Sequence, residues 1–122
     1  MKGFHKHSIS FKHAYDGVLW ALRSQPNYRI HIVFSTIAVF LGWTLAIDYY
    51  EWLLIILLIT MGLVIETLNT GLEATTDAIT REWREEIKIA KDVAAAAMLT
   101  FAVGAVIIAV MIFVPKIAAL IL

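Results

Sequence analysis

The sequence lacks cysteine entirely. The chain can therefore form no disulfide, and neither thiolate catalysis nor a cysteine-ligated metal centre is possible. Its N-terminal segment has no apolar run of the kind that signal peptides carry, so we expect no signal peptide. It also contains neither a Gly-rich phosphate-binding loop nor a protein-kinase catalytic loop. These absences exclude thiol chemistry and the common nucleotide-binding motifs.

The chain also lacks an excess of either charge, because ten Lys and Arg residues balance ten Asp and Glu residues. The net charge therefore says nothing about partners. What the chain has in excess is apolar residues, since 61% are hydrophobic and the mean hydropathy is +0.80. These values exceed those of an ordinary soluble domain. The composition predicts one small integral membrane domain over residues 1–122.

Four helical segments are predicted along the chain, which makes the expected fold an all-α membrane protein. Residues 1–24 are basic, with apolar residues at helical spacing, and they predict an amphipathic helix in the headgroup region. A solvated basic tail is the alternative for this segment. Long apolar stretches predict three transmembrane helices, at residues 30–47, 52–79 and 93–114.

The charged residues predict the orientation of these helices. Nine of the ten Lys and Arg residues lie before Ile30 or between Thr80 and Asp92. Because cytoplasmic segments are rich in Lys and Arg, we expect a multi-pass protein of the cytoplasmic membrane with its N-terminus in the cytoplasm. The charged stretch 80–91 is predicted to be a cytoplasmic loop, and Pro115 to end the third helix.

A line of polar residues interrupts the second membrane helix. Glu66, Asn69, Glu73 and Asp77 fall on one narrow stripe, at roughly 100° per helical residue; we call these four residues the polar stripe. Polar side chains there are costly unless they bind something, and carboxylates suit a divalent metal such as Mg²⁺. Glu66 is the deepest of them. Partial desolvation of its ionised form favours it as the general base.

The polar stripe has the sequence ETLNTGLEATTD and is followed by AKDVAAA from Ala90. Together they closely resemble the signature of the prokaryotic diacylglycerol kinase and undecaprenol kinase family, and the resemblance covers nearly the whole chain. It implies a homotrimer of three-span subunits whose active sites are shared between neighbours at the cytoplasmic boundary. The implied activity is ATP-dependent phosphorylation of a membrane lipid alcohol, either undecaprenol or diacylglycerol. The NYRIH and IAKDVAA stretches look closer to the undecaprenol kinase branch.

The resemblance also implies roles for individual residues. Glu66 matches the catalytic base, and Asn69 and Asp92 complete the catalytic set. Glu73 matches a ligand of Mg²⁺, and Gln25 stands at a second metal position. The residues that match contacts to ATP are Lys6, His13, Asp77, Glu82, Trp83, Arg84, Lys91 and Asp92. The expected partners are a membrane lipid, ATP and further copies of the chain, with no nucleic acid.

Two of these positions depart from the family pattern. Gln25 replaces a glutamate, and because a neutral amide oxygen binds Mg²⁺ more weakly, we expect weaker metal coordination by the N-terminal segment. Lys6 stands where the diacylglycerol kinase branch has an arginine, and a lysine binds phosphate only as a point charge.

Two other functions are compatible with carboxylates in a membrane helix. One is a small ion or proton carrier. It is disfavoured because the carboxylates crowd one end of the helix and the other two spans offer no matching polar residues to continue a pathway. The other is a structural subunit in which the polar stripe pairs with Arg and Lys of a partner.

The charge distribution makes a testable prediction about topology. Cysteines introduced as Ser8→Cys and Ala119→Cys should react with an impermeant thiol reagent from opposite sides of the membrane, because an odd number of spans separates them. The cysteine-free wild-type chain is the background control. Labelling of both positions from the same side would contradict three spans.

Overall fold

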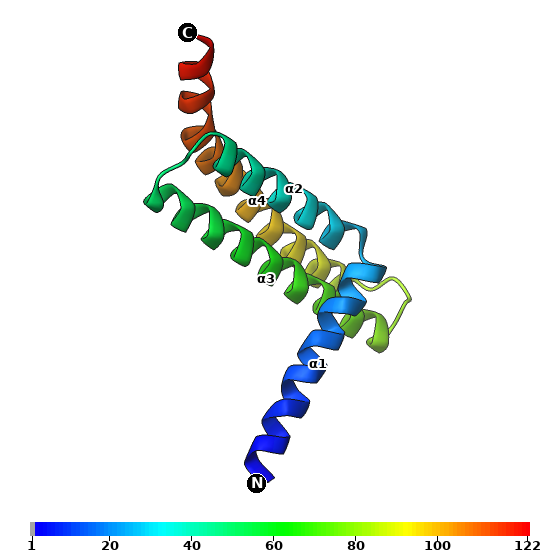
Figure 1. Cartoon of the computed structure of the whole chain (residues 1–122). Helices are drawn as coiled ribbons and strands as arrows, with labels where there is room; N and C mark the ends of the chain where they lie inside the picture. The colour runs from blue at the N-terminus through cyan, green and yellow to red at the C-terminus, as the bar shows by residue number, and fades with distance from the viewer. Residues whose placement is uncertain (1) are drawn as a thin grey trace.

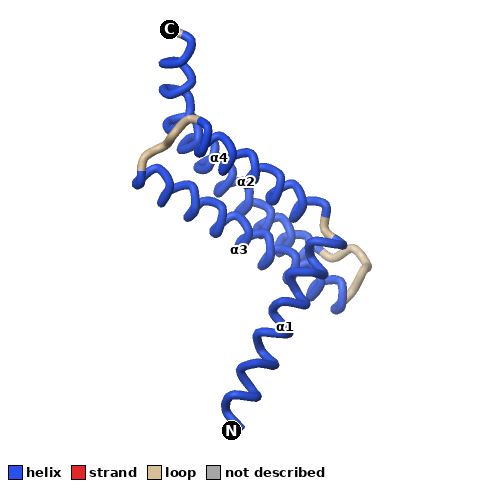
Figure 2. The backbone as a smooth tube through the Cα atoms, viewed as in Figure 1, coloured by secondary structure: helices blue, strands red, loops and turns tan. Residues whose placement is uncertain are grey.

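The computed structural model describes the backbone of residues 2–122 and the side chains of residues 7–122. All regular structure in this part of the chain is helical, as predicted. The four helices are α1 (Lys2–Ser24), α2 (Pro26–Thr44), α3 (Tyr49–Ile79) and α4 (Glu85–Ile121). Helices α2, α3 and α4 form a bundle in which α3 runs antiparallel to the other two, while α1 projects from one end (Figures 1 and 2).

Helices α3 and α4 are each long and apolar enough to cross a membrane. At about 1.5 Å per residue, the 31 residues of α3 extend about 45 Å, more than a hydrocarbon core of ~30 Å. Large apolar side chains cover the outside of the bundle, and Phe34 and Phe40 on α2 are 67% and 63% exposed. Such a surface is suited to contact with lipid or with another apolar helix.

The start of α4 differs from the prediction. The sequence predicts a loop over residues 80–91, but only residues 80–84 lie between α3 and α4. Glu85 and Glu86 occupy the first turn of α4, where the positive end of the helix dipole stabilises carboxylates. Lys88 then pairs with Asp92 one turn later on the same helix. The charges in this stretch therefore support a helix.

The end of α4 also differs from the prediction, because the helix continues through Pro115 to Ile121. A proline inside a helix lacks the N–H for one backbone hydrogen bond, and its ring crowds the carbonyl one turn earlier, which bends the helix. The last turns of α4, in red in Figure 1, accordingly leave the direction of the bundle. Lys116 Nζ lies 3.1 Å from Glu51 Oε2 and connects this bend to the start of α3.

The turn between α2 and α3 ends α2 earlier than the predicted limit of residue 47. The N–H of Ile47 donates to the carbonyl of Gly42 and the N–H of Ala46 donates to that of Trp43, the two hydrogen bonds of a Schellman motif. Ile47 packs over Gly42 so closely that a Cβ at Gly42 would lie 2.9 Å from the Ile47 side chain. This C-cap reverses the chain without an extended loop.

The apolar core of the bundle lies at this same end. Ile47, Ile55, Ile112 and Phe113 are buried together, with Trp52 packed against them. Asp48 caps α3 by accepting a hydrogen bond from the N–H of Glu51, and the Glu51 carboxylate accepts one from the N–H of Asp48. Packing and capping thus fix the three helices at the end remote from α1.

Ala46 provides a test of the C-cap, because it adopts φ 50° in a position that favours glycine. Ala46→Gly should stabilise the protein by about 1 kcal/mol, since an L-residue pays roughly this much for left-handed geometry. The measurement is denaturant unfolding in detergent. The matched control is Ala38→Gly inside α2, which should destabilise by about 1 kcal/mol. A loss of stability in Ala46→Gly would contradict this description of the turn.

Candidate active site on α3

The polar stripe runs from the interior of the bundle to its surface. Glu66 is buried, with 3% of its surface exposed. Asn69 is half-buried and Glu73 is exposed, and Asn69 Nδ2 donates to Glu73 Oε1 at 3.4 Å. Asp77 lies near the end of α3 with 42% of its side chain exposed. The stripe therefore combines one carboxylate shielded by the bundle with two that are open to ligands.

His31 on α2 is the polar residue that faces Glu66 from a neighbouring helix. Its Nε2 atom lies 3.9 Å from Glu66 Oε2. The residue stands in the NYRIH stretch of the family resemblance, but only the rotation of α2 against α3 shows that it faces Glu66.

The start of α4 meets the other end of the polar stripe. Lys91 Nζ donates to Asp77 Oδ1 at 2.9 Å and so joins α3 to α4. Both residues are among the predicted contacts to ATP. Asp92, assigned to the catalytic set, is exposed and its carboxylate pairs with Lys88. The structure therefore brings Lys91 to the polar stripe, while Asp92 is paired with Lys88 on α4.

The remaining predicted nucleotide contacts lie around this end of the bundle. Glu82, Trp83 and Arg84 form the exposed connection between α3 and α4, and Trp83 is 77% exposed. His13 is exposed on α1, whose first part projects from the bundle (Figure 1). Lys6 lies outside the residues whose side chains are described. Glu82, Trp83 and Arg84 therefore lie next to the end of α3 that carries Asp77.

The predicted metal ligands come from different elements of the chain. Glu73 is exposed on α3, and Gln25 is the half-buried N-cap of α2. Among residues 7–122, His, Asp and Glu side chains form no group of three that could hold a metal ion. Mg²⁺ is often held by only one or two carboxylates, with water and substrate phosphates completing its ligands. The exposed Glu73 fits that kind of site.

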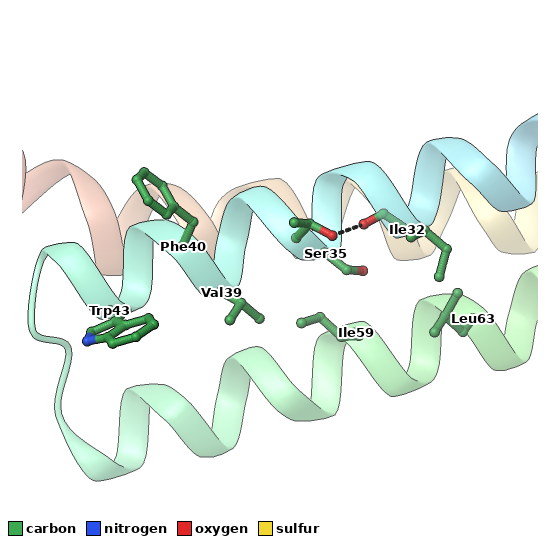
Figure 3. Close-up of a pocket in the computed structure, with 8 residues that line it drawn as sticks. Ile32, Ser35, Val39, Phe40, Trp43, Ile59 and Leu63 are labelled. Carbon is green, nitrogen blue, oxygen red and sulfur yellow. Dashed lines mark hydrogen bonds between the residues drawn. The ribbon is translucent and has the colours of Figure 1, made fainter.

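An open apolar groove lies between α2 and α3, with a volume of about 440 Å³. Figure 3 shows Val39 and Trp43 of α2 facing Ile59 of α3 across it. The groove begins at Ile32, the residue after His31, and extends toward the α2–α3 turn. Its full lining is Ile32, Ser35, Thr36, Val39, Phe40, Trp43, Ile59 and Leu63. An apolar surface thus leads away from the Glu66 end of the bundle.

Comparison with known proteins agrees with the sequence resemblance. The family model described as prokaryotic diacylglycerol kinase matches residues 12–113, most of the chain and all of the polar stripe. The chain belongs to the prokaryotic diacylglycerol kinase family. The predicted family and the predicted class, a membrane lipid kinase, are thereby confirmed, and nothing supports an ion carrier.

The relatives of this diacylglycerol kinase family member are named for two activities, undecaprenol kinase and diacylglycerol kinase. It is 37% identical over 107 residues to the undecaprenol kinase of Bacillus subtilis, covering 88% of this chain and 87% of the relative. It is 34% identical over 101 residues to a diacylglycerol kinase of Synechocystis, covering 82% of this chain but 58% of that longer relative. A diacylglycerol kinase of Helicobacter pylori is 31% identical over 98 residues, which are 80% of this chain and 77% of the relative.

Proposed function

We propose that the chain phosphorylates undecaprenol, with ATP as the phosphoryl donor and Glu66 as the general base. The observation that carries this proposal is the gradient along the polar stripe, from the buried Glu66 to the exposed Glu73 and the half-exposed Asp77. A lipid hydroxyl arrives from an apolar phase, whereas ATP arrives from water. The polar stripe presents a shielded proton acceptor at one end and solvated charges at the other, which suits both substrates.

In this proposal the reaction depends mainly on positioning and charge, as phosphoryl transfer generally does. Glu66 accepts the proton of the lipid hydroxyl as its oxygen attacks the γ-phosphate and the bond to ADP breaks. Lys91, held by Asp77 at the start of α4, supplies a positive charge for the phosphates. Asn69 orients Glu73 through their hydrogen bond. The connection containing Trp83 and Arg84 contacts the nucleoside part of ATP.

Glu73 is the residue that would hold Mg²⁺, and Gln25 would contribute weakly. When bound, the ion neutralises charge on the phosphates of ATP. The carboxylate of Glu73 is exposed and within reach of a hydrated ligand, which supports this assignment.

We further propose three spans and a homotrimer. With 19 residues, α2 extends about 28 Å, close to the ~30 Å of a hydrocarbon core, and its apolar side chains are exposed. The described residues of one chain hold no three-ligand metal site made of His, Asp and Glu side chains. Shared sites between neighbouring copies would complete it, with α1 on the membrane surface and the N-terminus in the cytoplasm.

Undecaprenol is favoured over diacylglycerol for two reasons. The undecaprenol kinase of Bacillus subtilis matches this chain over nearly its whole length. In addition, the groove between α2 and α3 starts at Ile32, the residue after His31, and is lined mostly by apolar side chains, as a single long hydrocarbon chain requires. Differences between lipid substrates in such a groove amount to only ~1–3 kcal/mol, so diacylglycerol is the second candidate.

The Glu66 assignment is tested by Glu66→Gln, which keeps the shape of the side chain but removes the proton acceptor. We expect kcat for undecaprenol phosphorylation to fall about 100-fold or more, in line with general-base contributions, while ATP affinity and assembly stay unchanged. Glu86→Gln is the matched control, because Glu86 is exposed on α4 away from the polar stripe. Turnover of Glu66→Gln within a few fold of wild type would refute the assignment.

The metal assignment is tested by opposite changes at its two positions. Glu73→Gln should sharply raise the Mg²⁺ concentration needed for half-maximal activity, because it removes the carboxylate ligand. Gln25→Glu should lower that concentration by adding one. The measurement is a Mg²⁺ titration of lipid phosphorylation at saturating ATP. An unchanged Mg²⁺ requirement in both variants would mean that neither residue coordinates the metal.

A further inference from the structure

His31 is held at Glu66 by the packing of all three bundle helices. It lies one turn after Tyr28, which is buried with 5% exposure, so this face of α2 is the one turned toward the protein. On α3, the ring lies beside Gly62, where a Cβ would come within 3.5 Å of His31 Nδ1. From α4, Phe101 approaches the same glycine so closely that a Cβ there would lie 2.9 Å from its ring.

On α3 itself, Asn69 and Thr70 are the polar residues one turn from Glu66. Glu73, two turns along α3, is a carboxylate that acts electrostatically on Glu66. Lys91 and Asp77 are paired with each other still further along the stripe. Phe101 is the residue that α4 presents at Gly62, one turn before Glu66. The Asn69 amide is one turn from Glu66 on α3 but donates to Glu73. His31 is therefore the nitrogen donor that a neighbouring helix brings to the Glu66 carboxylate.

The separation of 3.9 Å between His31 Nε2 and Glu66 Oε2 is too long for a hydrogen bond, which requires about 3.2 Å or less. A small rotation of either side chain closes this gap, and hydrogen bonds in catalytic sites commonly tighten when substrate binds. With Nε2–H donating to Oε2, the second carboxylate oxygen stays free for the lipid hydroxyl. The tautomer follows from the acceptor that Nε2 faces.

We propose that His31 is a positioning residue for the general base: its Nε2–H orients the Glu66 carboxylate toward the lipid hydroxyl. This inference rests on the proposed function of Glu66. It assigns to α2 a part in catalysis beyond crossing the membrane. His31 donates this hydrogen bond when substrate is bound and transfers no proton.

The test compares His31→Leu, which removes the donor, with His31→Gln, which retains an N–H donor on a flexible side chain. We expect kcat of His31→Leu to fall about 10-fold to 100-fold, as misplacement of a reacting group does, with the KM for ATP unchanged. His31→Gln should keep kcat within about threefold of wild type, because a positioning role needs only a donor. Phe34→Leu, at an exposed position on α2, is the control and should leave kcat unchanged.

The deciding measurement is the double variant Glu66→Gln with His31→Leu. If His31 acts through Glu66, adding His31→Leu to Glu66→Gln should lower kcat no further. A multiplied loss in the double variant, or wild-type kcat in His31→Leu, would overturn the positioning role. If Glu66→Gln alone retains turnover, the general base is elsewhere and the proposed function of Glu66 fails first. The two failures are therefore distinguishable.

Discussion

The structure depends on one costly arrangement, a carboxylate buried within an apolar helix bundle. Glu66 is 3% exposed, and His31 is the neighbouring group that can stabilise it across helices. Burying a charge is expensive unless it is paired or used, so such a residue marks a functional site in a membrane helix. The exposed part of the polar stripe continues from Glu66 to solvent, which connects the buried group to water-soluble ligands.

The two ends of the bundle divide stability and chemistry between them. The end formed by the α2–α3 turn holds the apolar core, the Schellman C-cap, the capping box of α3 and the pair between Glu51 and Lys116. The other end holds the polar stripe, Lys91 and the connection between α3 and α4. Because packing at the first end fixes the helices, the second can retain exposed charges and a projecting α1.

Much of this arrangement could be predicted from the sequence, because it depends on local spacing. The periodicity of the polar stripe placed it on one helix face, and the AKD sequence placed Lys91 near it. The contact between His31 and Glu66 could not be predicted, since it depends on how α2 is rotated against α3, which Tyr28 and Gly62 determine through packing. The prediction misplaced the start of α4 because its charged residues are typical of a loop but also suit the first turns of a helix. It misplaced the end of α4 because a proline inside a helix can bend it without ending it.

We propose above all that this family member transfers the γ-phosphate of ATP to an undecaprenol hydroxyl. The most direct measurement supplies purified wild-type protein in lipid nanodiscs with [γ-³²P]ATP, Mg²⁺ and either undecaprenol or diacylglycerol. We expect labelled undecaprenyl phosphate, formed in equal amount with ADP and faster than labelled phosphatidate. Release of ADP without label in either lipid would contradict the claim of lipid phosphorylation, and faster labelling of diacylglycerol would contradict the assigned substrate.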